Sequence, residues 1–270
     1  MPHTFACELR WADMDMLGHV NNVRYLDYLA AARGSALAGL AAGRVLSHQV
    51  EFVAPLVFHR DPVLVDTWVT DVEGGRLALA QEVYDEPDSG RRTYLRASSV
   101  LEHTAGERDR ARLDELRGSD HAWRDLDHPA REPRSTFETQ VRPGDLDQTG
   151  TVSDSVLFEY LQESRIRYVM GLHTRGQSWT HHVIARTDVQ YHRPMPFRAA
   201  PYAVHSWIGR VGTKSFTICA EVRDGDTVLA EATVVMVTFD KETQRPAPMA
   251  QSQRDRLEQE LSGSAAVSAG

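Results

Sequence analysis

The chain has 270 residues, of which 41% are hydrophobic and 25% are charged, a composition typical of a globular protein with a buried core. This length favours two domains of ordinary size. The formal net charge of −8 argues against a nucleic-acid partner, because binding to phosphates requires clustered lysine and arginine side chains.

The N-terminal residues MPHTFACELR contain no apolar core of a secretory signal. The most apolar long stretch, residues 28–46, is interrupted by Arg33 and Arg44 and falls short of a membrane span. We therefore expect a cytoplasmic protein with no membrane span. The two cysteines, Cys7 and Cys219, lie in strand-like runs with no nearby partner, which favours buried reduced thiols over a disulfide or a zinc site.

The first predicted strand, TFACELRW, leads into a polar loop, RWADMDMLGHVNN, at residues 10–22. A helix is predicted to start near Val20, and the asparagines of the loop are typical of capping residues in its first turn. Its apolar residues recur at roughly helical spacing, at Val23, Tyr25, Leu26, Leu29 and Leu37.

Four further strand-like runs follow the helix, at residues 47–58, 63–72, 76–85 and 93–104. Turn-forming residues separate them, for example Gly74 and Gly75. One helix with about five strands and no alternating crossover helices predicts an α+β unit, in which an antiparallel sheet curls around its helix.

A second copy of this unit follows in the chain. Residues 142–165 align with residues 10–33 without a gap. Composition alone would give about one or two identical positions, and this alignment has more. The identical pairs are Arg10/Arg142, Asp13/Asp145, Asp15/Asp147, Gly18/Gly150, Val20/Val152, Tyr28/Tyr160, Leu29/Leu161 and Arg33/Arg165. The duplication predicts an N-terminal domain at residues 1–117, a polar linker at 118–135, a C-terminal domain at 136–249 and a tail at 250–270 that begins with a short charged helix.

A strand, the motif Asp-x-Asp-x-x-Gly, a helix and the run VEFVAPLVFHRDPVLVDTWV together resemble the hotdog-fold thioesterases. Within them the chain is most similar to the 4-hydroxybenzoyl-CoA thioesterase-like acyl-CoA hydrolases. HVNN at His19–Asn22 also resembles the motif of plant and bacterial acyl-ACP thioesterases, which carry an asparagine where this chain has Leu17. The resemblance implies a tandem hotdog fold, with two antiparallel sheets each wrapped around a long helix and joined edge to edge.

The same resemblance implies hydrolysis of acyl-CoA, or of acyl-ACP, with Asp15 as the catalytic residue. Asp15 would act as a general base or as a nucleophile that forms a mixed anhydride, and the sequence leaves both open. Gly18, His19, Val20 and Asn22 are predicted to bind the substrate, because free N–H groups at a helix start suit an oxyanion. For His19, orienting water and capping the helix remain alternatives.

A purely structural alternative is that the aspartates only end the strand and cap the helix. Asp13 fits this structural role better than Asp15 does. The second loop keeps Asp147 and Gly150, but it replaces the histidine and both asparagines of the first loop. We therefore expect Asp147 and Gly150 to form a second, weaker site.

No cofactor and no metal is predicted. His181, His182 and His192 match no standard metal-site spacing. Besides the substrate, the expected partners are further copies of the tandem chain in a homo-oligomer. A non-catalytic protein that binds acyl thioesters is the alternative function; a hotdog dehydratase or hydratase fits less well, because its catalytic loop has a different spacing.

Three arginines lie in turns where they could meet the phosphates of coenzyme A, although basic turns are usually only solvated. They are Arg60, Arg91 and Arg92.

Overall fold

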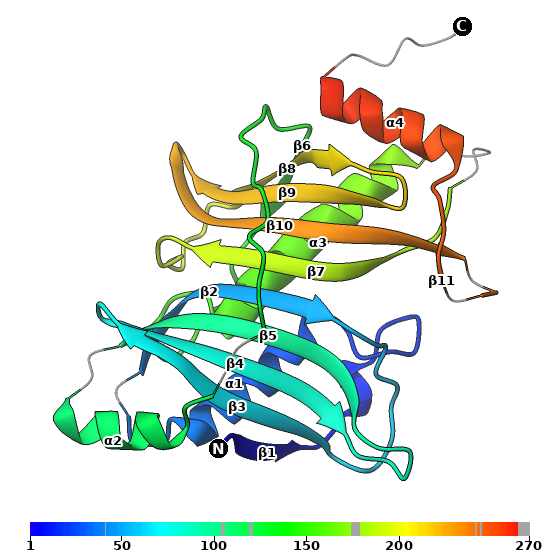
Figure 1. Cartoon of the computed structure of the whole chain (residues 1–270). Coiled ribbons are helices and arrows are strands. Elements are labelled where there is room, and N and C mark those ends of the chain that lie inside the picture. Colours follow the sequence, from blue (N-terminus) through cyan, green and yellow to red (C-terminus); the bar gives the residue numbers. More distant parts are fainter. Residues whose placement is uncertain are drawn as a thin grey trace, which may run out of the picture. The chain divides into compact units, whose positions relative to one another are not determined.

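The structure is a computed structural model that describes residues 1–40, 42–103, 106–118, 121–173, 179–240, 242–243 and 245–263. It divides into two compact units, Met1–Arg124 and Asp125–Gly270. Each unit has one antiparallel sheet with a helix packed against one face (Figure 1). The predicted α+β unit, present twice in the chain, is confirmed.

The sheet of the first unit has the strand order β1-β3-β4-β5-β2, with every neighbouring pair antiparallel. Its elements are β1 (His3–Cys7), the 3-10 turn η1 (Trp11–Asp13), α1 (Arg24–Ala36), β2 (Ala42–Phe52), β3 (Val63–Glu73), β4 (Arg76–Asp85), β5 (Arg92–His103) and α2 (Glu107–Glu115). The sequence did not predict α2, because this charged run has no apolar stripe at helical spacing. The single leucine of α2, Leu113, is nevertheless buried.

Helix α1 begins at Arg24, so the prediction of a start near Val20 was wrong. The backbone at Val20 is extended, because it forms a bridge with Met14 and donates its N–H to the carbonyl oxygen of Leu56 at 2.8 Å. The side chain of Asn21 accepts a hydrogen bond from the N–H of Val23 at 3.0 Å, just before the helix. A valine in this position suits a bridge as well as a helix, so the apolar pattern did not locate the start.

The sheet of the second unit repeats the order of the first, as β6-β8-β9-β10-β7, with the short β11 paired to β10. Its elements are β6 (Ser135–Thr139), η2 (Pro143–Asp145), α3 (Asp154–Leu172), β7 (His182–Tyr191), β8 (Tyr202–Val211), β9 (Ser215–Asp224), β10 (Thr227–Asp240), β11 (Arg245–Pro246) and α4 (Gln251–Ser262). This identical connectivity is what a tandem duplication requires. Whether the two sheets join edge to edge stays a prediction.

The tail contributes to the core of the second unit. The predicted charged helix is α4, and its Leu257 is fully buried among residues of α3 and the sheet. The hydroxyl of Tyr168 in α3 donates a hydrogen bond to Glu260 of α4 at 3.0 Å. The predicted C-terminal domain, residues 136–249, is therefore shorter than the compact unit.

The end of the predicted linker lies across the outer face of the same sheet (Figure 1). The indole N–H of Trp207 in β8 donates to the carbonyl oxygen of Pro129 at 2.9 Å, and the hydroxyl of Thr233 in β10 donates to that of Asp127 at 3.4 Å. We call residues 125–134 the strap. The strap is thus part of the second unit and not a free connection.

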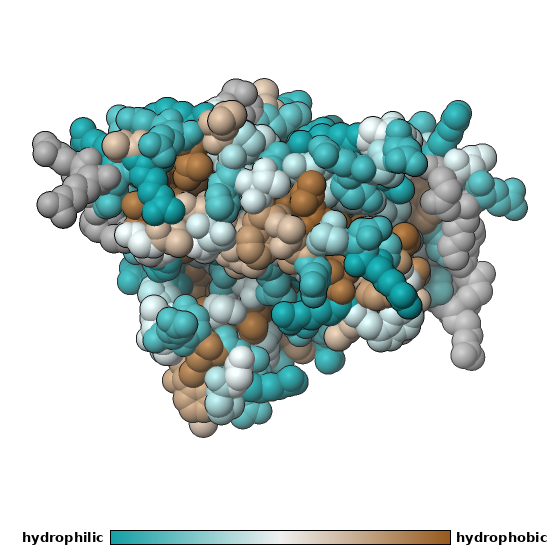
Figure 2. Space-filling view, turned by 90° about the horizontal axis from the view of Figure 1, so that it is seen from below, coloured by the Kyte–Doolittle hydropathy of each residue, from teal (hydrophilic) through white to brown (hydrophobic). Residues whose placement is uncertain are grey.

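Among the described residues, no helix is both long and apolar enough to span a bilayer. On the face shown in Figure 2, apolar residues lie in small groups between hydrophilic ones. Cys7 and Cys219 are free thiols, as predicted; Cys219 is buried, whereas Cys7 is only half-buried.

Candidate active site

The loop of the first unit is a tight reversal centred on Gly18. The N–H of Asp15 donates to the carbonyl oxygen of His19 at 2.8 Å, and the N–H of Gly18 donates to that of Asp15 at 3.1 Å. Gly18 has φ = 76°, a left-handed conformation that glycine adopts without strain. The chain therefore reverses direction between residues 15 and 19, and the carboxylate of Asp15 lies within this turn.

The two oxygens of the Asp15 carboxylate have different surroundings. Oδ1 accepts hydrogen bonds from the N–H groups of Leu17 at 2.8 Å and His19 at 3.3 Å. Oδ2 has no hydrogen-bond partner within the described ranges, and the side chain is half-buried. One oxygen therefore fixes the orientation while the other stays available for proton transfer or attack. The Oδ1 contacts are also those of an ordinary Asx turn, so they do not by themselves require catalysis.

The N–H groups predicted to hold an oxyanion are already occupied. Gly18 and His19 donate to Asp15, and Val20 donates to Leu56. These residues precede α1, which begins at Arg24, so they do not supply free N–H groups of its first turn, and their binding of the substrate stays a prediction. A contribution of the His19 ring, which forms no hydrogen bond with described residues, stays a prediction.

Asn22 differs from the other predicted substrate-binding residues of the first loop. Neither its N–H nor its side-chain amide forms a hydrogen bond with any residue that the structure describes. Its neighbour Asn21 instead accepts a hydrogen bond from the N–H of Val23, the residue before α1. Asn22 thus has free donors close to the start of α1, which is what an oxyanion would need.

Asp13 braces the loop from inside, as its predicted structural role requires. It is buried, and Oδ2 accepts hydrogen bonds from the hydroxyl of Tyr28 at 2.6 Å and the N–H of Arg10 at 2.9 Å. Burial, together with the bond to Asp13, raises the pKa of Tyr28 and keeps its hydroxyl protonated as the donor. In the second unit, Tyr160 donates to Asp145 at 2.5 Å in the same way.

The second loop repeats the turn with one additional contact. Oδ1 of Asp147 accepts from the N–H groups of Thr149 at 2.8 Å and Thr151 at 3.3 Å, and Gly150 has φ = 81°. The hydroxyl of Thr149 also donates to Oδ1 at 2.6 Å. Asp147 is exposed, whereas Asp15 is half-buried. The backbone is the same, but the second carboxylate is more solvated.

Exposed apolar side chains surround the first loop, and sequence reasoning missed them. Met16 and Leu17 project from the turn itself, with Leu17 74% exposed. The aligned residues of the second loop are the polar Gln148 and Thr149, which was the available signal. We define the apolar rim as Trp11, Met16, Leu17, Val57 and Phe58, all exposed.

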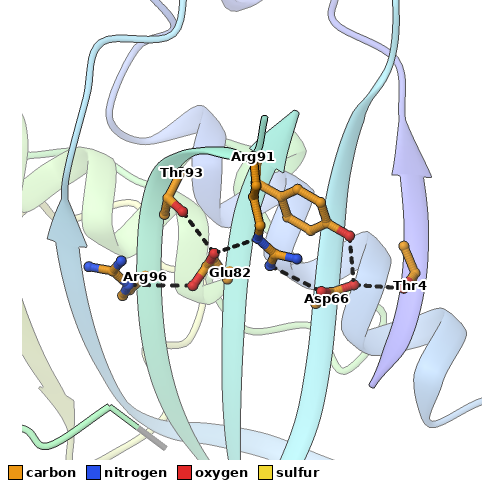
Figure 3. A network of polar contacts seen from close by, with 7 residues as sticks. Thr4, Asp66, Glu82, Arg91, Thr93 and Arg96 are labelled. Atoms are coloured by element: carbon orange, nitrogen blue, oxygen red, sulfur yellow. Dashed lines mark hydrogen bonds and ion pairs between the residues drawn. The ribbon is translucent and has the colours of Figure 1, made fainter. Parts of the chain in front are cut away.

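Arg91 is already engaged by a polar network on the sheet of the first unit (Figure 3). It donates to Asp66 at 3.1 Å and to Glu82 at 3.0 Å, and its guanidinium lies 3.3 Å from the centre of the Tyr84 ring. Two carboxylates neutralise this arginine, so the suggestion that it binds coenzyme A phosphates loses its basis.

The structure does not bring His181, His182 and His192 together as a set of three possible ligands among the described residues. His182 is largely buried beside the ring of Phe216, and this burial lowers its pKa. Within the described ranges, one set of three or more His, Cys, Asp and Glu groups lies close enough together to share an ion. It comprises His128, Glu221 and Glu231, and the sequence did not predict it.

Both repeats match the family model of the thioesterase-like superfamily, over residues 9–115 and 141–257. Among solved structures, the chain is similar to the 12:0-ACP thioesterase from Umbellularia californica, with a TM-score of 0.69 and 13% identity over 88% of this chain and 94% of that one. It is also similar to an acyl-ACP thioesterase from Bacteroides thetaiotaomicron VPI-5482, with a TM-score of 0.59 and 14% identity over 87% of this chain and 97% of that one.

A third similar structure is a conserved protein of unknown function with hot dog fold from Alicyclobacillus acidocaldarius, with a TM-score of 0.56 and 12% identity over 88% of this chain and 94% of that one. A comparison with curated protein sequences finds no match. At these identities the solved structures show the fold alone. Because the family model covers most of both units, the chain belongs to the thioesterase-like superfamily, and it has the tandem hotdog fold.

Proposed function

We propose that the protein hydrolyses acyl thioesters to a free acid and a thiol, with Asp15 as the catalytic residue. The observation that carries this proposal is the asymmetry of the Asp15 carboxylate, in which Oδ1 is held by two main-chain N–H groups and Oδ2 has no partner in the described ranges. Membership in the thioesterase-like superfamily supports the reaction class.

In the base mechanism, Oδ2 of Asp15 takes a proton from water, and the hydroxide attacks the thioester carbonyl carbon. The C–S bond then breaks, and the departing sulfur takes up the proton that Asp15 had accepted. In the nucleophilic mechanism, Oδ2 attacks the same carbon, the C–S bond breaks, and the sulfur leaves as a thiolate that takes a proton from water. Water then hydrolyses the mixed anhydride to the free acid and the Asp15 carboxylate. In both, negative charge develops on the carbonyl oxygen, and we assign its stabilisation to the free donors of Asn22.

Acyl-CoA is the first substrate class we propose, in a cytoplasmic protein that assembles as a homo-oligomer. Acyl-ACP is the second, because two similar structures carry that name. The apolar rim beside Asp15 supports a hydrophobic acyl group, since its side chains would gain about 25 cal/mol per Å² of apolar surface removed from water.

The test is release of free thiol from a panel of acyl-CoA and acyl-ACP thioesters of different chain length, measured by reaction with a chromogenic disulfide. We expect turnover on at least one member, without added cofactor. Tight binding of an acyl thioester with no turnover on the whole panel would favour the non-catalytic binding protein. That alternative is kept because an Asx turn alone explains the contacts of Oδ1.

A further inference from the structure

Two glutamates face each other on the outer side of the sheet in the second unit. Glu221 of β9 and Glu231 of β10 are directly opposite in the antiparallel register. Like charges in this position destabilise a strand pair unless a cation lies nearby. Arg223 donates to Oε2 of Glu221 at 2.6 Å, and Nε2 of His192 lies 3.4 Å from Oε2 of Glu231. These contacts engage one oxygen of each carboxylate.

The strap brings a histidine to the same place. Nε2 of His128 lies 3.9 Å from Oε1 of Glu221, beyond hydrogen-bond range, and it is a buried atom with no hydrogen-bond partner among the described residues. The imidazole is held by the ring of Trp207, whose centre is 5.3 Å from its own. A buried nitrogen without a partner is destabilising, because it has lost its hydrogen bonds to water. The strap thus carries an unsatisfied atom to a pair of carboxylates.

The other ring nitrogen shows how His128 could act as a ligand. Nδ1 lies 3.0 Å from the hydroxyl oxygen of Thr233, which itself donates to the carbonyl oxygen of Asp127. When the hydroxyl hydrogen points to Asp127, the oxygen accepts from Nδ1–H, and the lone pair is on Nε2. A hydrogen bond on one ring nitrogen that leaves the other free is the usual arrangement of a metal-binding histidine.

We propose that His128, Glu221 and Glu231 bind one zinc ion that fastens the strap to β9 and β10. The three ligand atoms lie within 4.8 Å of one another. Ligands of a tetrahedral zinc ion stand about 3.3 Å apart, given bonds of about 2.0–2.1 Å, so rotation of the glutamate side chains has to bring them closer. One imidazole and two carboxylates suit zinc, and water fills the fourth position.

An adjacent cavity gives the ion a route from solvent. It has a volume of about 360 Å³ and is lined by Glu221, Arg223 and His205 together with residues 130–133 of the strap. The positive charge of Arg223 opposes the ion, whereas the two carboxylates attract it. The ion has a structural role in the second unit, and the proposed hydrolysis at Asp15 does not depend on it.

The test uses the full-length chain freed of metal with EDTA and titrated with zinc chloride in a calorimeter. We expect one ion per chain and a rise in Tm of about 5 °C or more at saturation. His128→Gln and Glu231→Gln should each weaken binding about tenfold or more, the effect of removing one ligand. Cobalt(II) bound to the wild-type chain should show the visible absorption of a tetrahedral site. This absorption should be absent in both variants.

His121→Gln is the matched control. Nε2 of His121 also lies 3.9 Å from a glutamate, Glu51, but His121 belongs to no group of three possible ligands among the described residues. This variant should bind zinc like the wild type. Absence of saturable binding below about 100 μM zinc overturns the proposal. So does unchanged affinity in both His128→Gln and Glu231→Gln, which shows adventitious binding elsewhere. Hydrolysis of thioesters is a separate readout, and its failure leaves this test intact.

Discussion

The loops at residues 10–22 and 142–154 share most of their backbone hydrogen bonds but have different surroundings. In both, an aspartate accepts from the N–H groups two and four residues later, and a glycine with positive φ reverses the chain. The first loop has the half-buried carboxylate and the apolar rim, whereas the second has an exposed carboxylate that also binds a threonine hydroxyl. The two loops therefore share the geometry of the turn and differ in the side chains around it.

The sharpest test of this difference is a matched pair of substitutions, Asp15→Asn and Asp147→Asn. Asparagine has nearly the size of aspartate, and its side-chain oxygen can still accept the hydrogen bonds of the turn, but it cannot serve as the base. We expect Asp15→Asn to lower kcat about 100-fold or more, the scale of lost acid–base catalysis. Asp147→Asn should lower it less than about fivefold, because we assign it the weaker site. Thiol release at saturating substrate measures both.

Both variants must first unfold at temperatures close to that of the wild type, because the Oδ1 contacts are themselves worth about 1 kcal/mol as a cap. Loss of turnover in Asp147→Asn with full turnover in Asp15→Asn would invert the assignment. Full turnover in both would reduce the two carboxylates to caps.

A second comparison concerns the buried aspartates Asp13 and Asp145. Asp13→Ala leaves the buried hydroxyl of Tyr28 without its acceptor and should cost about 2–3 kcal/mol of unfolding free energy. Asp145→Ala should cost about 1 kcal/mol, because its bond to Tyr160 is only partly buried. Urea unfolding followed by circular dichroism measures the two. Equal losses would show that the loops are braced alike.

The aligned arginines Arg33 and Arg165 should respond differently to replacement by methionine. Arg165 is 9% exposed, and burial lowers its pKa to about 10; no carboxylate of the described residues pairs with it. Replacing this unpaired buried charge by methionine should stabilise the protein by about 1–2 kcal/mol. Arg33→Met should stabilise nothing, because Arg33 is only partly buried and has partners. Calorimetric Tm values decide, and a lower Tm for Arg165→Met would contradict the prediction.

The smallest effect is expected from giving the first loop the side chains of the second. Met16→Gln with Leu17→Thr removes part of the apolar rim but leaves the turn, since neither side chain supports it. We expect KM for long acyl thioesters to rise about threefold to tenfold, the effect of about 1 kcal/mol of lost apolar contact, with kcat nearly unchanged. An equal rise for acetyl and long-chain substrates would show that the rim does not contact the acyl group.

The sequence predicted the strands well where alternation and turns coincide. Strand β4 matches its predicted residues, 76–85, because Gly74 and Gly75 mark its start. The predicted start of α1 was wrong, because an apolar pattern does not distinguish the bridge at Val20 from a first helical turn. The core role of α4 was missed because Leu257 is a lone leucine in a charged run.

The candidate site was predictable only in part. The repeat and the family resemblance pointed to Asp15, but the sequence cannot show that one carboxylate oxygen accepts two hydrogen bonds while the other has no partner among the described residues. It also cannot show that Glu221 and Glu231 are opposite in register, or that His128, about a hundred positions away in the chain, lies above them. These facts depend on strand pairing, which short-range patterns do not determine.

The turn around Asp15 is also modular. The contacts that orient its carboxylate come from Leu17 and His19, so they close within four positions of the chain. Contacts of such short sequence separation form fast in folding and need no distant partner to be correct. Transplanting residues 10–22 into the place of 142–154 should therefore carry the geometry intact. Under the proposed function, the side chains around the turn can change with the acyl group while the same small hairpin continues to present its aspartate.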